Sequence, residues 1–463
     1  MSCSMKVRAL SVFAGKKQLM GPVDFELKPG STLVIMGETG AGKSLIAQAL
    51  IGTLPTKLWT EGEITINGQR VDQLSKTKRS ELWGREISML PQEPWRSLDP
   101  LMRSFLQVKE TYQYVSSLHK AEAVKATNNA FSRLELSGSE QRLPGELSGG
   151  MAQRVAFAAA TAAKATILLA DEPTKGLDAT RHTKVIDLLA NLTQKGGSLL
   201  VITHEVSVAR RLGGELMVLR EGTLVEQGLT ESVLENPCDD YTLALIKADP
   251  QCWPSTSRVE PGEILLSLRN LAIARGGQRL FEDFSLDVRE SEKIAITGPS
   301  GIGKTTLIDT MAGILKPAAG TVSHSQLLPN YGIQKLYQDP PAAFPKHVPL
   351  CYSLRDVALK HKTDWSDVLQ FFDQLGIELS MLNRRPDEVS GGELQRIAIA
   401  RALSVKPKIL LADEPTSRLD PITQRETLEM LSRIADKEQI AIVLVTHDQN
   451  IAKKWADREI SLT

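Results

Sequence analysis

The stretch GETGAGKS, at Gly37–Ser44, lies between an apolar run and a segment with helical spacing. Glycines let the backbone adopt turns that side chains would block, so that several N–H groups point into one concavity. The Lys-Ser pair that opens the helix adds an ammonium group and a hydroxyl to the positive end of the helix dipole. The pattern therefore predicts a loop that cradles phosphate, with the serine hydroxyl available to Mg²⁺.

A second loop of the same kind, GPSGIGKT, occupies Gly298–Thr305. Other stretches also recur in the same order, which indicates that the chain is an internal duplication. The recurring stretches are LSGGMAQR at 147–154 with VSGGELQR at 389–396, LLADEPT at 168–174 and 410–416, and VITHE at 201–205 with LVTHD at 444–448.

The boundary between the two copies is indicated by composition. Residues 248–262, ADPQCWPSTSRVEPG, are rich in proline and serine and show no apolar periodicity, as is typical of a linker. We therefore predict a first domain at residues 1–248, a linker at 249–262 and a second domain at 263–463.

Short apolar runs rich in β-branched residues alternate with helical segments in each copy. Residues 166–171 and 198–203 are typical of buried strands, and the segment 182–195 between them has helical spacing. Such alternation predicts an α/β fold with a mostly parallel sheet covered on both faces. Residues from about 100 to 147 are polar with a helical pattern, and this predicts a helical insertion.

Composition and charge argue against several classes of protein. Lys plus Arg and Asp plus Glu are both 55, so the basic excess of a nucleic-acid-binding protein is missing. No apolar run reaches the roughly 18 residues that a membrane span needs, and the N-terminus shows no apolar core of a signal peptide. The four cysteines lack C-x-x-C spacing, which predicts reduced thiols without a metal or disulfide role. We therefore expect a cytoplasmic protein with no nucleic-acid partner.

The repeated stretch ILLADEP places an Asp-Glu pair at the end of a predicted buried strand in each copy. Ligands of open α/β sheets bind at the carboxyl ends of the strands. We expect Asp171 and Asp413 to bind Mg²⁺, and Glu172 and Glu414 to polarise an attacking water. The alternative is a pair of capping carboxylates, which the neighbouring glycine loops make the weaker interpretation.

The order of these motifs resembles that of ATP-binding cassette (ABC) ATPases. Gly-x-x-Gly-x-Gly-Lys-Ser/Thr is followed by Gln, Ser-Gly-Gly, Asp-Glu and His, twice, over nearly the whole chain. The Ser-Gly-Gly block is the specific part, because other P-loop proteins lack it. The resemblance implies tandem P-loop NTPase domains of the ABC type, each with a mostly parallel sheet core, an antiparallel β subdomain and a helical subdomain.

The resemblance also assigns roles to individual residues. The predicted catalytic residues are Glu172, Glu414 and the switch histidines His204 and His447, which contact the γ-phosphate in the family. The predicted ATP-binding residues are Gly37, Gly40, Gly42, Lys43, Ser44, Gln92, Ser148, Gly149, Gly150, Gly298, Gly301, Gly303, Lys304, Thr305, Gln338, Ser390, Gly391 and Gly392. The predicted Mg²⁺ ligands are Ser44, Gln92, Asp171, Thr305, Gln338 and Asp413. Asp178 and Asp420 fit the D-loops of the family.

The family also explains why the phosphate loop occurs twice. Two cassettes stack head to tail, and each ATP lies between the P-loop of one and the Ser-Gly-Gly signature of the other. The resemblance thus implies that this chain carries both halves of its own dimer. A helix that begins at the signature would direct its N–H groups and dipole at the γ-phosphate.

Some positions depart from the family pattern. The aromatic residue that stacks on adenine would fall at Ala14 and Arg275. Phe13 could replace it in the first copy if the loop shifts by one residue, and the guanidinium plane of Arg275 could stack in the second. Glu205 follows the first switch histidine where Asp is more usual. None of these positions handles the γ-phosphate, so both sites are expected to be competent.

Three further stretches resemble parts of oligopeptide, dipeptide and nickel importer ATPases. Two of them are the Q-loop regions, PQEPWRSLDP at 91–100 and YQDPPAAFP at 337–345, and the third is a Pro-x-x-x-Tyr-Thr-x-x-Leu pattern at 237–245. The resemblance implies an ATPase that powers import of a small solute of the peptide, nickel or metal-chelate class. It would lie peripherally on the cytoplasmic face of the inner membrane, with two integral-membrane permease subunits and, through them, an extracytoplasmic solute-binding protein.

Two alternatives remain open. One is an importer ATPase for another solute, such as a sugar. The other is a soluble two-cassette ABC protein that acts on ribosomes, a class that joins its cassettes by a long charged helical linker. The short linker and the zero net charge of this chain favour the importer.

Overall fold

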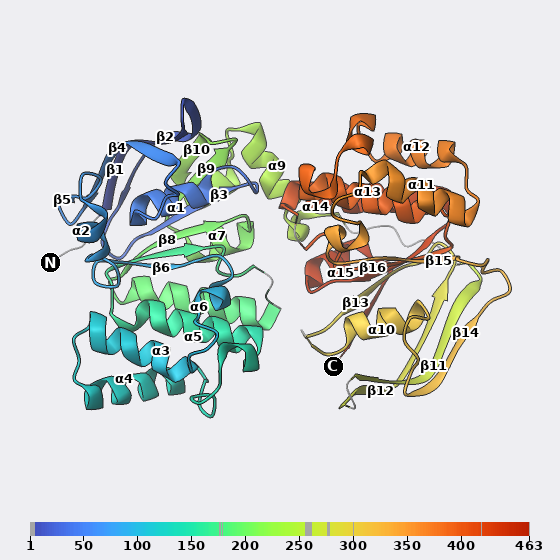
Figure 1. Cartoon of the computed structure of the whole chain (residues 1–463), viewed down its shortest axis with the longest axis horizontal. Coiled ribbons are helices and arrows are strands. Elements are labelled where there is room, and N and C mark those ends of the chain that lie inside the picture. Colours follow the sequence, from blue (N-terminus) through green and yellow to red (C-terminus); the bar gives the residue numbers. More distant parts are fainter. Residues whose placement is uncertain are drawn as a thin grey trace. The chain divides into compact units, whose positions relative to one another are not determined.

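The chain divides into two compact units, Met1–Asp249 and Pro250–Thr463. The structure, a computed structural model, describes residues 5–175, 177, 179–254, 262–275, 278–299, 301–417 and 419–462. Figure 1 shows the helices and strands of both units and labels many of them.

The first unit contains a mostly parallel sheet and an antiparallel sheet. The parallel sheet has the strand order β10-β9-β3-β8-β7-β6, in which only the β9–β10 hairpin is antiparallel. Its strands are β3 (Thr32–Gly37), β6 (Ile87–Leu90), β7 (Ile167–Asp171), β8 (Ser198–Thr203), β9 (Glu215–Arg220) and β10 (Thr223–Leu229). The antiparallel sheet, of order β2-β1-β4-β5, consists of β1 (Met5–Ala14), β2 (Lys17–Leu27), β4 (Leu58–Ile66) and β5 (Gln69–Arg70).

The second unit repeats this plan. Its sheet of order β15-β16-β17-β13-β18 is parallel throughout, and its antiparallel sheet has the order β12-β11-β14. The strands are β11 (Ile264–Arg275), β12 (Gln278–Arg289), β13 (Lys293–Thr297), β14 (Ala319–His324), β15 (Ile333–Leu336), β16 (Ile409–Asp413), β17 (Ala441–Val445) and β18 (Arg458–Ser461).

The helices occupy corresponding places in the two units. Those of the first unit are α1 (Lys43–Ile51), α2 (Lys76–Ser80), α3 (Ser104–Glu110), α4 (Lys120–Arg133), α5 (Gly149–Ala162), α6 (Ala179–Gln194), α7 (Val206–Leu212), α8 (Thr230–Glu235) and α9 (Asp240–Ala248), with the short turns η1 (Pro94–Ser97), η2 (Thr111–Val115) and η3 (Pro144–Glu146). Those of the second unit are α10 (Lys304–Met311), α11 (Leu350–His361), α12 (Trp365–Gln374), α13 (Gly391–Leu403), α14 (Pro421–Glu438) and α15 (Gln449–Trp455), with η4 (Pro250–Cys252), η5 (Pro340–Ala343), η6 (Leu379–Asn383) and η7 (Pro386–Glu388).

Both faces of each parallel sheet are buried, which explains the continuous apolar runs in the sequence. In β16, Ile409 and Leu411 pack with α10 and the antiparallel sheet, whereas Leu410 and Ala412 pack with the helices α11 to α13. Because side chains alternate along a strand, one apolar run supplies two cores. Figure 1 shows α10 between the parallel and the antiparallel sheet of this unit.

The predicted fold class is confirmed, and so is the helical insertion, which contains α3 and α4. Part of the predicted linker is folded: η4 packs on α15, and Trp253 lies 7% exposed in a core cluster of the second unit. Residues 255–261 of the predicted linker are outside the described residues. No helix of the described part of the chain is long and apolar enough to cross a membrane.

Candidate functional site

The parallel sheet of each unit brings the separated motifs to one edge. In the first unit β3 pairs with β8, and β8 with β7, so that Met36 lies opposite Thr203 and Asp171 opposite Ile202. The phosphate loop follows β3, Glu172 follows β7 and His204 follows β8. In the second unit β13, β17 and β16 pair in the same way. Neighbouring parallel strands thus place the loop, the acidic pair and the histidine together.

The two glycine loops have the geometry of phosphate cradles. Gly42 and Gly303, with φ of 86° and 112°, precede the first residues of α1 and α10, and a side chain in this conformation would be strained. Lys43 Nζ donates hydrogen bonds to the carbonyl oxygens of Gly37, at 2.7 Å, and Glu38, at 2.6 Å. Lys304 Nζ bonds the corresponding carbonyls at 2.7 and 3.1 Å. Both ammonium groups therefore lie within their loops, where phosphate oxygens would enter. The other predicted loop glycines with positive φ are Gly37, Gly40, Gly298 and Gly301.

The residues of the first unit fit a magnesium ion. Asp171 Oδ1 is buried and has no hydrogen-bond partner in the described part of the chain. Burial raises the pKa of Asp171, and a hydrogen bond from the Ser44 side chain opposes this shift. A buried carboxylate beside a hydroxyl at a helix start is a suitable oxygen donor set for Mg²⁺.

The second unit differs at the equivalent carboxylate. Burial again raises the pKa of Asp413, and Lys335 and Thr305 oppose the shift. Lys335 Nζ lies 3.7 Å from Asp413 Oδ2 and 2.6 Å from Asp309 Oδ1. Sequence reasoning missed this buried lysine, because its position on β15 does not by itself place it beside β16. Thr305 and Asp413 remain a suitable oxygen pair for Mg²⁺.

Glu172 and Glu414 occupy equivalent strained positions directly after β7 and β16. Both have φ of 46°, a left-handed conformation that non-glycine residues seldom adopt and that is concentrated at functional sites. Glu172 N–H donates to Ile202 O at 2.8 Å, and Glu414 N–H donates to Val445 O at 3.1 Å. These bonds to the neighbouring strand turn both carboxylates toward the histidine and the glutamine of their own unit.

Three side chains contact Glu172. Gln92 Nε2 donates to Oε2 at 3.1 Å, Lys175 Nζ lies 2.9 Å from Oε2, and His204 Nδ1 lies 3.2 Å from Oε1. Burial alone would raise the pKa of Glu172, but His204 and Lys175 outweigh it and lower the pKa to about 2. The carboxylate is therefore charged over the whole physiological range.

Among the described residues, Glu414 has fewer side-chain partners than Glu172. Gln338 Nε2 donates to Oε2 at 3.0 Å, and His447 Nδ1 lies 3.5 Å from the same oxygen. Burial would raise the pKa of Glu414, but His447, Lys304 and Gln338 together lower it. The structure thus joins Gln92 and Gln338, predicted as Mg²⁺ ligands, directly to the predicted catalytic residues Glu172 and Glu414.

The two signature stretches begin helices. Ser148 caps α5 by accepting a hydrogen bond from Met151 N–H at 3.4 Å, and Ser390 caps α13 by accepting from Glu393 N–H at 3.3 Å. Gly149 and Gly150, like Gly391 and Gly392, form the first turns of these helices. The N–H groups of a first helical turn lack partners within the helix and are suited to bind an anion.

The structure describes one of the two predicted D-loop residues and the aromatic residue predicted to stack on adenine in the first unit. Asp420 caps α14 by accepting from Thr423 N–H at 3.0 Å, and Asp178 lies outside the described residues. The Phe13 ring stacks on the Trp59 ring, with the centroids 4.5 Å apart and the planes at 15°. The sequence did not indicate this aromatic pair, because Trp59 reaches Phe13 only through the pairing of β1 with β4.

Glu205, which departs from the family pattern, connects three elements of the first unit. Its carboxylate lies 2.6 Å from His182 Nε2 on α6 and accepts a hydrogen bond from Thr174 Oγ1 at 2.6 Å. In the second unit Asp448 caps α15 instead. The longer glutamate side chain therefore holds α6 next to the switch histidine, a contact that sequence reasoning missed.

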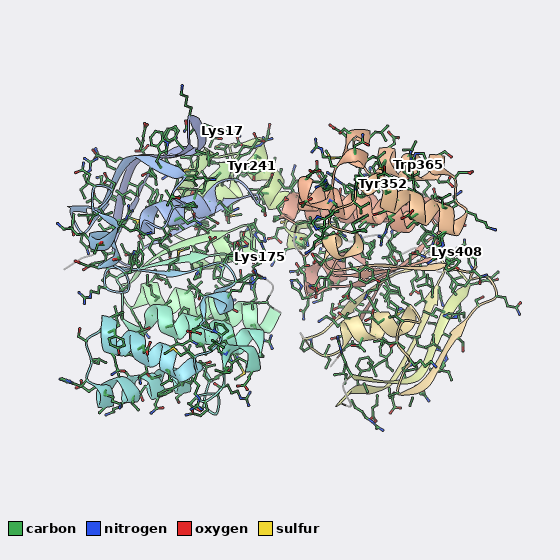
Figure 2. All side chains as sticks on the ribbon, viewed as in Figure 1. Lys17, Lys175, Tyr241, Tyr352, Trp365 and Lys408 are labelled. Carbon is green, nitrogen blue, oxygen red and sulfur yellow. The ribbon has the colours of Figure 1, made fainter. Side chains whose placement is uncertain are left out.

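Tyr241, singled out in the sequence only as part of a pattern, contacts the first phosphate loop. Its hydroxyl accepts a hydrogen bond from Glu38 N–H at 2.8 Å, and Arg220 lies over its buried ring at 5.3 Å from the centroid. Figure 2 labels this side chain. The second loop has Pro299 at the position of Glu38, and proline carries no N–H to donate. This hydrogen bond therefore has no counterpart at Pro299 of the second loop.

Replacing Tyr241 by phenylalanine is expected to weaken ATP binding to the first loop by about threefold, because one ordinary hydrogen bond that orients the loop is lost. Equilibrium binding of ATP in a Lys304→Ala background measures the first loop alone. The same substitution in a Lys43→Ala background is the control, and it should leave the second loop unchanged. Equal weakening of both loops would show that Tyr241 acts through general stability.

A family model described as ABC transporter matches residues 20–175 and 281–417 of the chain. The matched regions contain both phosphate loops, both glutamines at the carboxyl edge, both signatures and both Asp-Glu pairs. The two matches reproduce the duplication read from the sequence.

Several curated relatives align over almost the whole chain. The peptidoglycan transport ATP-binding protein YejF of Agrobacterium fabrum is 29% identical, over 94% of this chain and 86% of its own length. An uncharacterized ABC transporter ATP-binding protein YejF of Escherichia coli K12 is 30% identical, over 96% and 90%. The glutathione import ATP-binding protein GsiA of Salmonella typhi is 28% identical, over 94% and 80%.

Solved structures support the fold. The archaeal ribosome recycling factor aABCE1, in complex with the stalk protein aP1, superposes with a TM-score of 0.68 at 24% identity, over 95% of this chain and 84% of its own. A structure named RNase-L Inhibitor superposes with a TM-score of 0.66 at 23% identity, over 94% and 84%. At this level of identity the likeness concerns the fold alone.

Proposed function

The chain belongs to the ABC transporter family, and from this we propose that it is the ATP-hydrolysing subunit of a membrane importer for a small solute. One observation carries the proposal. Each half joins a lysine-bearing phosphate loop, a buried aspartate and a glutamate paired with a histidine at the same sheet edge. Two such sets in one chain are what hydrolysis of two ATP molecules requires.

The chemistry follows from the positions of these groups. The oxygen of a water molecule attacks the γ-phosphorus, the bond from that phosphorus to the β-phosphate oxygen breaks, and ADP and phosphate leave. Glu172 and Glu414 orient the water and accept its proton, and the histidines beside them hold the carboxylates in place. Lys43 and Lys304 neutralise charge on the phosphates. Ser44 and Asp171 in the first half, and Thr305 and Asp413 in the second, would hold Mg²⁺, and the ion would supply positive charge that offsets the charge of the phosphates.

The signatures complete the proposed sites. We infer that Ser390 and Gly392 act on the ATP of Lys43, and that Ser148 and Gly150 act on the ATP of Lys304, in the head-to-tail pairing that the family resemblance implies. The support is chemical, since both signatures present the first turn of a helix, whose N–H groups are suited to bind a γ-phosphate.

The names of the relatives suggest a class of transported solute. One relative is named for peptidoglycan transport and another for glutathione import. Both substances contain short peptides, so we propose a small peptide or a peptide-derived solute. Two integral-membrane permease subunits and an extracytoplasmic solute-binding protein are the proposed partners, and the cytoplasmic face of the membrane is the proposed location. The nickel and metal-chelate classes stay predictions from the resemblance.

Cell fractionation tests this proposal. The chain is expected to sediment with membranes when its permease is co-expressed and to leave them when the permease genes are deleted, because no helix of the described residues can span the bilayer. Cosedimentation with ribosomes, measured on the same lysates, is the test of the alternative. Retention in membranes without any permease, or enrichment on ribosomes, would contradict the importer assignment.

A further inference from the structure

The catalytic glutamates of the two halves differ in one neighbour, and the difference lies three residues further along the chain. In the first half Lys175 Nζ lies 2.9 Å from Glu172 Oε2. In the second half the corresponding residue is Ser417, whose hydroxyl donates to the backbone carbonyl of Glu414 at 3.0 Å and not to the carboxylate. Figure 2 labels Lys175.

The backbone of this turn is the same in both halves. Lys175 N–H donates to Glu172 O at 3.3 Å, and Ser417 N–H donates to Glu414 O at 3.2 Å. Both glutamates also share the left-handed φ of 46°. The difference around the two carboxylates therefore comes from the side chain at the fourth residue of the turn, which is Lys175 in the first half and Ser417 in the second. The effect of Lys175 on Glu172 can therefore be compared with that of Ser417 on Glu414 within the same chain.

Both carboxylate oxygens of Glu172 have partners, and the ion pair adds a cation to one of them. Oε2 contacts Lys175 and Gln92, Oε1 contacts His204, and the side chain is 8% exposed. In Glu414 both partners, Gln338 and His447, contact Oε2, and the side chain is 18% exposed. Within the described residues Oε1 of Glu414 has no hydrogen bond or ion pair. A water molecule can therefore reach Glu414 Oε1 but must displace a cation or a histidine from Glu172.

We propose that Lys175 is a positioning residue that restrains Glu172, so that the first half retains ATP while the second half carries most of the hydrolysis. The inference rests on the proposed ATPase function. In the reaction the carboxylate orients the water and takes its proton as the oxygen–phosphorus bond forms and ADP departs. A carboxylate oxygen held by an ammonium group is a poorer acceptor for that water, because the charge-assisted hydrogen bond must first be broken.

A reciprocal exchange in the full chain tests the proposal. Lys175→Ser gives the first half the residue of the second, and Ser417→Lys does the reverse. Steady-state phosphate release gives kcat and KM for Mg-ATP. Vanadate trapping of 8-azido-ATP, followed by illumination and mapping of the labelled peptides, reports which half has hydrolysed nucleotide.

The wild-type chain is expected to trap the label mostly in the second half. Lys175→Ser should raise trapping in the first half by about tenfold, the factor that corresponds to one charge-assisted hydrogen bond, with kcat raised and KM unchanged. Ser417→Lys should lower kcat by about the same factor and remove most label from the second half. A gain of hydrolysis after Lys175→Ser cannot result from damage to the fold.

Two further variants sharpen the result. Lys175→Arg keeps a cation beside Glu172 and should retain the wild-type pattern. Lys184→Ser, which removes an exposed ion pair with Glu135 in the same unit, should also leave the pattern unchanged. Equal trapping in both halves of the wild type, or a fall in kcat after Lys175→Ser, would overturn the inference and leave the ATPase function intact. No trapping in either half, with ATP still bound, would contradict the proposed function itself.

Discussion

Replacing Glu172 and Glu414 together by glutamine is expected to lower ATP hydrolysis by about a hundredfold or more, while two ATP molecules remain bound to each chain. Glutamine keeps the shape of the side chain and one acceptor oxygen, but it carries no charge and cannot accept a proton from water. ATP binding should persist because the phosphate loops, with Lys43 and Lys304, are unchanged. Phosphate release measures the first effect, and equilibrium binding of radiolabelled ATP measures the second.

An exposed glutamate serves as the control for this double variant. Glu231→Gln, in the first turn of α8, should leave hydrolysis and binding at their wild-type values. Hydrolysis that survives in the double variant would mean that another group takes the proton. One ATP per chain, in place of two, would contradict the interpretation of both glycine loops as nucleotide sites.

The second large effect concerns the proposed head-to-tail pairing. Glu172→Gln combined with Ser390→Arg is expected to be little worse than Glu172→Gln alone, because both changes act on one transition state. Glu172→Gln combined with Ser148→Arg should damage both sites and approach complete loss of hydrolysis. Turnover is measured together with ATP occlusion at each site, since coupling between the sites would otherwise blur the contrast.

The steric effect of the introduced arginine needs its own control. Ser132→Arg places the same side chain at an exposed position of α4 and should change neither turnover nor occlusion. If Ser148→Arg adds nothing to Glu172→Gln while Ser390→Arg adds a further loss, each half serves its own nucleotide. The head-to-tail pairing would then be wrong.

The fold class and the chemistry at the sheet edge could be predicted because their signals are local. A glycine loop followed by Lys-Ser requires only its own backbone and the start of a helix, and the apolar run of β16 followed by Asp413 and Glu414 requires only a strand and its end. Each signal also occurs twice, which separates it from chance. The sequence alone was therefore sufficient to predict a fold of two tandem ABC cassettes.

The sequence by itself determined the duplication, the α/β architecture and the candidate groups for binding phosphate and activating water, because short-range backbone preferences and apolar periodicity suffice for these. Only the tertiary structure decided which side chains surround those groups. Tyr241 reaches Glu38 N–H across about 200 residues, and Lys335 lies beside Asp413 because β15 pairs with β16. Even Lys175, three residues from Glu172, contacts its carboxylate only because the strained turn folds the chain back. Such contacts depend on packing in three dimensions, and neither residue spacing nor composition specifies that packing.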